Sequence, residues 1–178
     1  QWRNSALDFS SLRRLILSLE MPSGHPALIH NPHALDEWVL RRMAEDAAIG
    51  PNIAGARQVR RLWDLARLPD FRKAGPEGHA RLVLGLAETL ADPDARLSDK
   101  GLERRLDDLS STQGDIAKLQ QRLANIRTWT YAAHRPDWLE NPEKWQDRTR
   151  EIEDSLSDAL HEALTARFVD RRTTALLA

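Results

Sequence analysis

The spacing of apolar residues constrains this chain more than any other feature. Apolar side chains recur every three or four residues along most of its length, which is the period of one face of an α-helix. The strict alternation that marks a half-buried strand is nearly missing, and leucine, alanine, arginine and glutamate, all good helix formers, dominate. We therefore predict an all-α fold, an irregular bundle of about seven helices with a long C-terminal helix.

Capping residues and prolines indicate where these helices begin and end. Asp8 is a candidate N-cap for the first helix, which ends before the turn-rich residues 22–26. Asn31-Pro32 and Asn141-Pro142 each combine a capping side chain with proline at the first helical position, and so predict the starts of the second and last helices. The other expected helices run from about 54 to 67, from Pro76 through Leu90, from a Ser98 cap through Leu109, and from a Thr112 cap to about Ala133.

The last helix carries an apolar seam in which steps of four and three residues alternate, a pattern that favours close packing against a neighbouring helix. Its members are Trp145, Thr149, Ile152, Leu156, Ala159 and Ala163. A helix running from there to the end of the sequence would be roughly 55 Å long at about 1.5 Å per residue. We therefore expect either a break near Phe168 or a partner outside this sequence.

Two junctions look weak, residues 21–32 and residues 92–97, because turn-forming residues gather there. We predict an N-terminal bridging helix and loop over residues 1–30, followed by a helical accessory domain over 31–178. The sequence opens without methionine and ends within a helical pattern, so we expect a fragment of a larger protein.

Composition excludes several functional classes. The formal net charge of -1 excludes a globally basic nucleic-acid coat. The lack of cysteine excludes disulfides, thiolate nucleophiles and cysteine-ligated zinc. No apolar stretch approaches the roughly 20 residues that span a bilayer, and no signal-peptide core follows the N-terminus. We expect a cytoplasmic protein.

No catalytic, metal or cofactor site is predicted in this sequence. Its eight glycines are scattered and form no phosphate-binding loop. The helix containing His161 begins like a zinc-protease helix, but Thr165 stands where a second imidazole is needed. The loop histidines His25, His30 and His33 could bind a metal, although such a group is more often simply solvated.

Local basic charge is the remaining functional signal. The segment from Arg57 to Lys73 holds six basic residues against two acids, Asp64 and Asp70. A second segment, residues 122–138, interleaves arginines with aromatic rings, which suits phosphates and stacked bases of a single strand. The candidate nucleic-acid contacts are Arg60, Arg61, Arg72 and Lys73 in the first segment, and Arg127, Trp129, Tyr131 and Arg135 in the second.

A second interpretation of the same residues stays open. Trp129 and Trp138 could belong to the core, and the arginines could pair with the acidic helix over residues 140–162. In that case the basic segments stabilise the fold and bind nothing.

Several long stretches resemble the region that follows the motor domains in bacterial Suv3-like (Ski2-like) helicases of superfamily 2. The stretches are residues 2–4 and 7–12, Leu62-Trp63, residues 69–72, 125–131, 134–139, 153–162 and 164–173. The sequence departs from the family pattern at Asn125, where histidine is expected, at Ala66-Arg67, where Cys-Gln is expected, and at Gln113, where an acid is usual.

The resemblance implies a parent helicase whose two RecA-like motor domains lie upstream in the same polypeptide and use ATP and magnesium. This helical part would pack on those motors and guide single-stranded RNA or DNA, and the predicted helix over residues 112–133 would line the channel. The alternative function is a docking scaffold, in which the long last helix binds a nuclease or a second copy of the chain.

Overall fold

The structure, a computed structural model, describes residues 2–29 and 34–177, and in the last helix it describes side chains as far as Val169. Within these residues the chain forms α-helices, one short 3-10 helix and no sheet, which confirms the predicted all-α fold. The chain divides into two compact units, residues 1–96 and residues 97–178. The boundary falls inside the second predicted junction, residues 92–97, and not at residue 30.

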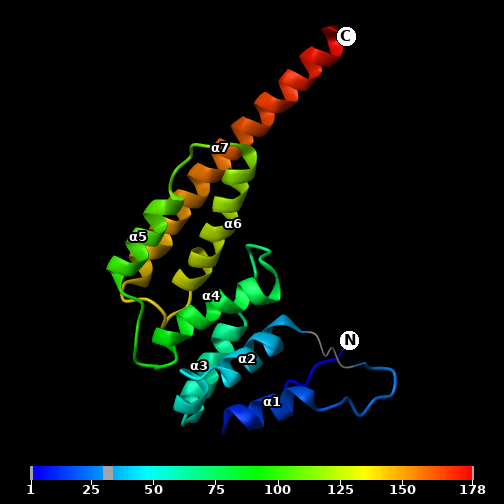
Figure 1. The fold of residues 1–178 in the computed structure, drawn as a ribbon, viewed down its shortest axis with the longest axis vertical. Coiled ribbons are helices and arrows are strands. Elements are labelled where there is room, and N and C mark those ends of the chain that lie inside the picture. Colours follow the sequence, from blue (N-terminus) through cyan, green and yellow to red (C-terminus); the bar gives the residue numbers. More distant parts are fainter. Residues whose placement is uncertain (1, 30–33, 178) are drawn as a thin grey trace. The chain divides into compact units, whose positions relative to one another are not determined.

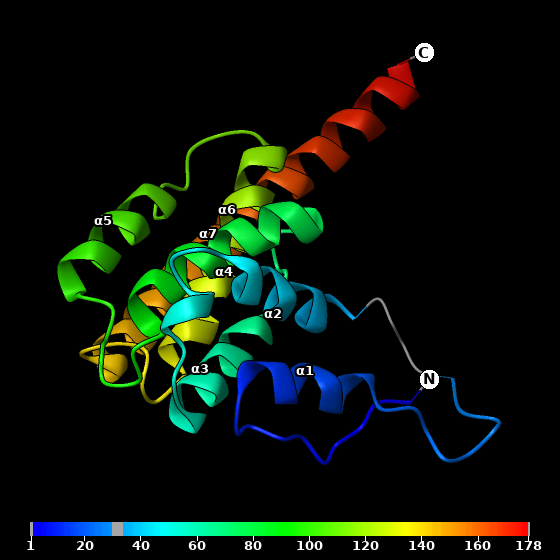
Figure 2. The ribbon, with the colours of Figure 1, turned by 60° about the horizontal axis from the view of Figure 1, so that its bottom comes forward.

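Unit 1 is organised around its second helix. Its elements are α1 (Leu12–Glu20), α2 (Leu35–Glu45), the 3-10 helix η1 (Gly50–Asn52), α3 (Ala56–Ala66) and α4 (Gly75–Leu90), drawn in blue to green in Figures 1 and 2. Helix α2 packs against α1, α3 and α4. Leu15, Leu40, Met43, Leu62 and Val83 are fully buried in this core. The expected bridging helix, α1, is therefore an integral part of unit 1.

Unit 2 is built on an antiparallel pair of helices. It contains α5 (Asp99–Leu109), α6 (Ile116–Ala133) and α7 (Pro142–Leu177). The first half of α7 runs along α6, while its second half continues past the end of α6 (Figure 1). The first four seam residues, from Trp145 to Leu156, are at most 3% exposed, so the seam forms the core of this pair.

Two predicted helix caps are wrong, each because a nearby side chain caps the helix instead. Ser11 caps α1 by accepting a hydrogen bond from the Arg14 backbone N–H, whereas Asp8 accepts one from Ser10. Asp115 caps α6 in place of Thr112, following Gly114, whose positive φ of 133° is open only to glycine. Helix α7 continues without a break near Phe168, so of the two expectations for its length the partner outside this sequence is the one that stays a prediction.

The Ser98 cap of α5 is confirmed, because its hydroxyl accepts a hydrogen bond from the Gly101 N–H. The predicted cap at Asn31-Pro32 lies outside the described residues. None of the helices in the described part of the chain has both the length and the apolar character that crossing a bilayer requires.

Candidate nucleic-acid interface

Two of the eight predicted contact residues are buried. Arg61 is 7% exposed and donates a hydrogen bond of 2.9 Å to the Pro93 carbonyl. Trp129 is 6% exposed, and the Arg105 guanidinium covers its ring at 5.3 Å. Trp138 is buried as well, as the core interpretation of the tryptophans expects. Arg61 and Trp129 therefore do not belong to an accessible interface in this fold.

Arg127 and Tyr131 share one face of α6, because they are spaced four residues apart, and Arg135 follows just after the last residue of that helix, Ala133. The Arg135 guanidinium lies 5.6 Å from the Tyr131 ring and 5.9 Å from the Trp138 ring. Arg127 is exposed, but its Nε lies 3.3 Å from a carboxylate oxygen of Glu153 on α7. This face combines guanidinium groups with rings, and one of its arginines already has an acidic partner.

The loop between α3 and α4 carries Arg72 and Lys73. Arg72 is half-buried and donates a 3.2 Å hydrogen bond to the Gly78 carbonyl, so its guanidinium is partly committed to the fold. Lys73 is exposed and has a positive φ of 52°, a conformation that non-glycine residues rarely adopt. The Asp70 carboxylate accepts hydrogen bonds from the backbone N–H groups of Ala74 and Gly75 and so shapes this turn.

His79 on α4 anchors the loop between α3 and α4. Its side chain is fully buried, and its Nε2 lies 2.8 Å from the Leu68 carbonyl, so Nε2 carries the proton and donates it. Burial lowers the pKa of His79, because a charged imidazolium loses its hydration there. The ring is therefore neutral at physiological pH, and it positions the backbone from which Arg72 and Lys73 project.

The lowered pKa of His79 makes the stability of the chain pH-dependent. Below pH 6.5, the ordinary pKa of histidine, the unfolded chain binds a proton that the folded chain resists. The free energy of unfolding should then fall by up to about 1.4 kcal/mol per pH unit until the lower folded pKa is reached. Denaturant titrations at a series of pH values measure this slope. His79→Gln should flatten it, whereas His134→Gln at an exposed position should not.

A hollow of about 560 Å³ lies between α3 and the N-terminal segment of unit 1. Arg60 on α3 and Arg67, the C-cap residue of that helix, line it together with Phe9, Trp63, the half-buried acid Asp64 and the segment 5–7. The Arg60 guanidinium lies 4.3 Å from the centre of the Phe9 ring. Neither arginine forms an ion pair with another described residue, and both are exposed.

Arg67 and Phe9 were missed as site residues in the sequence. Arg67 lies within the predicted basic segment, and its spacing from Arg60 was a usable signal, since residues seven apart share a helix face. Phe9 carried no such signal, because only the tertiary structure brings the N-terminal segment beside α3.

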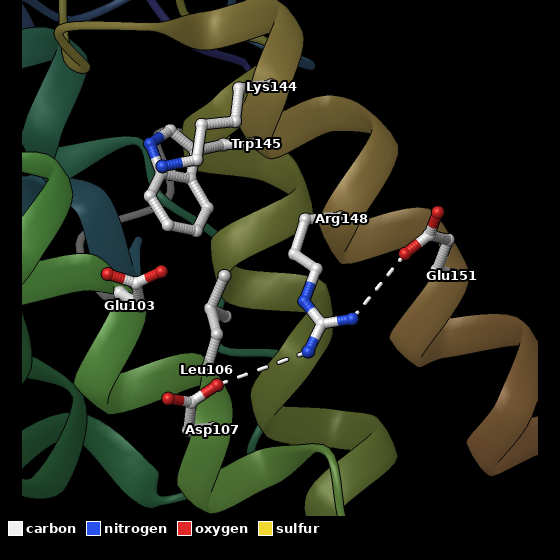
Figure 3. Close-up of a pocket in the computed structure, with 7 residues that line it drawn as sticks. All are labelled: Glu103, Leu106, Asp107, Lys144, Trp145, Arg148 and Glu151. Carbon is white, nitrogen blue, oxygen red and sulfur yellow. Dashed lines mark hydrogen bonds and ion pairs between the residues drawn. The ribbon is translucent and has the colours of Figure 1, made fainter.

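A second hollow, of about 370 Å³, lies between α5 and α7 (Figure 3). Its charged groups largely neutralise one another. Arg148 lies 4.0 Å from Asp107 and 3.5 Å from Glu151, and Lys144 lies 3.4 Å from Asp99. Because its two cations already face acids, this hollow fastens α5 to α7 and is a poor receptor for an anionic ligand.

Among the described residues, no group of three histidine or acidic side chains is placed to hold a metal ion. Comparison with known protein families, with curated proteins and with solved structures finds no match to the chain.

Proposed function

We propose that this chain is a helical accessory part of an ATP-dependent helicase and that it holds single-stranded RNA or DNA. The observation that carries the nucleic-acid part is the pair Arg60 and Arg67, two exposed guanidinium groups beside one hollow and an aromatic ring. The helicase part is supported by the resemblance of residues 125–139 and 153–173 to the Suv3-like region. In this proposal, RecA-like domains of the same polypeptide supply ATP hydrolysis and movement.

The chemistry of the hollow suits a strand of nucleic acid. A guanidinium group offers a fork of N–H donors that matches two phosphate oxygens. The Phe9 ring holds the plane of Arg60 in place, which reduces the conformational freedom lost on binding. Seven helical residues rise about 10 Å, so Arg60 and Arg67 would contact different phosphates of one strand.

The face of α6 supports a second contact for the strand. Arg127 is more accessible than Tyr131 or Arg135, with a side chain 52% exposed. To bind a phosphate, the Arg127 guanidinium must first give up its ion pair with Glu153, and the cost of breaking that pair weakens its contact with the phosphate. We therefore assign α6 the smaller share of the affinity.

The first test removes the two arginines of the hollow. Arg60→Ala with Arg67→Ala should weaken binding of a labelled single-stranded oligonucleotide by about a hundredfold or more, because each of the two charge-assisted contacts contributes about 1.5–3 kcal/mol. It should also reduce the slope of log affinity against log salt by about 1.4, since each contact with a single-strand phosphate contributes about 0.7. Fluorescence anisotropy over a range of salt concentrations measures both quantities.

Arg81→Ala is the matched control, because Arg81 is an exposed arginine of the same unit that lies outside the hollow. It should leave both the affinity and the salt slope close to those of the unchanged chain. If the control lost as much affinity as the double variant, the hollow would not be a specific site, and its arginines would contribute only general positive charge. An unchanged chain that binds neither RNA nor DNA would refute the proposal. Arg127→Ala in the same assay measures how much α6 contributes to the affinity for the oligonucleotide.

A further inference from the structure

A hollow of about 450 Å³, which we call the α1 hollow, lies between α1, α2 and η1 within unit 1. On α1 it is lined by the half-buried Leu12 and Ile16, one turn apart, and by Leu17, which is 46% exposed. Ala44 and Gly50 line it on the other side, and neither carries a side chain large enough to fill the space. Volumes of about 300–1,000 Å³ are typical of small-molecule sites. The α1 hollow therefore offers an apolar surface of the size that a small ligand needs.

The charged residues that line the α1 hollow include one cation without an acidic partner. Arg41 pairs with Glu20, the last residue of α1, and with the buried Glu37. Arg13 is exposed and forms no ion pair with another described residue. One end of the hollow thus presents a guanidinium group that an anion can bind, whereas the charges at the other end are already paired.

The spacing along α1 gives the ligand its shape. Arg13 and Glu20 are seven residues apart, which corresponds to about 10 Å along the helix axis, and the apolar side chains of Ile16 and Leu17 come between them. We propose that the α1 hollow binds a small amphipathic carboxylate. Its carboxylate group accepts hydrogen bonds from the Arg13 guanidinium, whose N–H groups match two carboxylate oxygens, and its short hydrocarbon chain lies along Ile16 and Leu17.

The size of the α1 hollow favours a small molecule over a docked protein. A stable protein interface involves about 20–30 residues on each side, whereas eight described residues line this hollow. The α1 hollow shares no lining residue with the hollow beside Arg60. The inference therefore does not depend on the proposed nucleic-acid function, and each can fail without the other.

Titration of the isotope-labelled chain with octanoate, followed by the NMR signals of its backbone amides, tests the site. The signals of α1 and of Ala44 and Gly50 should shift in a saturable way, and the signals of unit 2 should stay in place. Binding should tighten by up to about fourfold for each methylene added between hexanoate and octanoate, the value for full burial of a methylene. The neutral alcohol 1-octanol, titrated in the same way, measures the contribution of the hydrocarbon chain alone.

Arg13→Gln should weaken octanoate binding about two- to fivefold, the range for an exposed ion pair, and leave octanol binding unchanged. Arg14→Gln is the matched control, because Arg14 is the next residue and is exposed, but it does not line the α1 hollow and its Nε lies 3.8 Å from Asp8. This control should bind both probes as the unchanged chain does.

Leu17→Ser should weaken the binding of octanoate and of octanol alike, because both hydrocarbon chains lose an apolar contact. Its control is Met21→Ser, since Met21 is 55% exposed just after α1 and does not line the hollow. Circular dichroism verifies that every variant stays helical. The inference is overturned if octanoate shows no saturable binding, if the shifted signals spread over both units, or if Arg13→Gln and Arg14→Gln weaken binding equally.

Discussion

Replacing Trp145 with alanine is expected to lower the free energy of unfolding by about 3–5 kcal/mol, the typical cost of deleting a buried tryptophan side chain. The indole is 2% exposed and lines the hollow between α5 and α7 together with Leu106 (Figure 3). Its Nε1 donates a 2.7 Å hydrogen bond to Asp99, the first residue of α5. The loss of this side chain removes core packing and the tie between the two helices. Urea denaturation followed by circular dichroism measures the change.

Trp145→Phe separates packing from the hydrogen bond, because phenylalanine keeps an apolar ring and loses the donor. The hydrogen bond from Trp145 is the main cause that lowers the pKa of Asp99, and Asn141 and Lys144 add to it. The ionised carboxylate thus stabilises the folded chain above its ordinary pKa of 3.8, and this contribution is lost as the pH falls. Trp145→Phe should weaken that acid dependence and destabilise less than alanine does. A loss below about 1 kcal/mol on Trp145→Ala would contradict the packing described here.

Replacing Gly50 with alanine should destabilise the chain by about 2–3 kcal/mol through overcrowding. A Cβ at this position would lie 2.1 Å from the Ala44 carbonyl oxygen and 3.0 Å from its carbonyl carbon. Both atoms are backbone of α2, so rotation of a side chain cannot relieve the overlap. The chain would have to separate α2 from η1, where the Gly50 N–H donates a 2.9 Å hydrogen bond to Asp46. Thermal unfolding measures the loss.

Gly85→Ala is the matched control for this substitution. Gly85 lies inside α4, it is exposed, and an added Cβ would meet no atom within 4 Å. Alanine there should be neutral or stabilise the chain by up to about 1 kcal/mol, because glycine is a poor helix former. If the two substitutions gave equal stability, the close approach of Gly50 to Ala44 would be disproved.

The helices and their order were predictable because their signals are local. Apolar spacing identified the seam of α7, and Ser98 marked the start of α5, since a hydroxyl and the backbone N–H it caps lie three residues apart. Local rules failed where two candidates competed. Ser11 and Asp115 cap their helices in place of the predicted residues Asp8 and Thr112, and nothing in the sequence indicated which candidate would form the cap.

The candidate site was predictable only in part. Sequence identified the basic segment containing Arg60, and the structure places that arginine beside a hollow. The same reasoning selected Arg61, the next residue along, which faces inward and bonds to Pro93. Neighbouring helical residues point about 100° apart. Two adjacent arginines on α3 can therefore differ completely in exposure, because other parts of the fold cover only one face of the helix.

The sequence by itself determined the helical periods, most helix ends and the apolar seam of α7, because these depend on residues within one or two turns of one another. Only the tertiary structure decided that Trp129 is buried beneath Arg105, that Arg127 faces Glu153, and that Phe9 supports Arg60. Each of these contacts joins residues at least 24 positions apart, as between Arg105 and Trp129, and their meeting depends on which helix faces pack together. Apolar burial sets that packing, and the accessible charges follow from it.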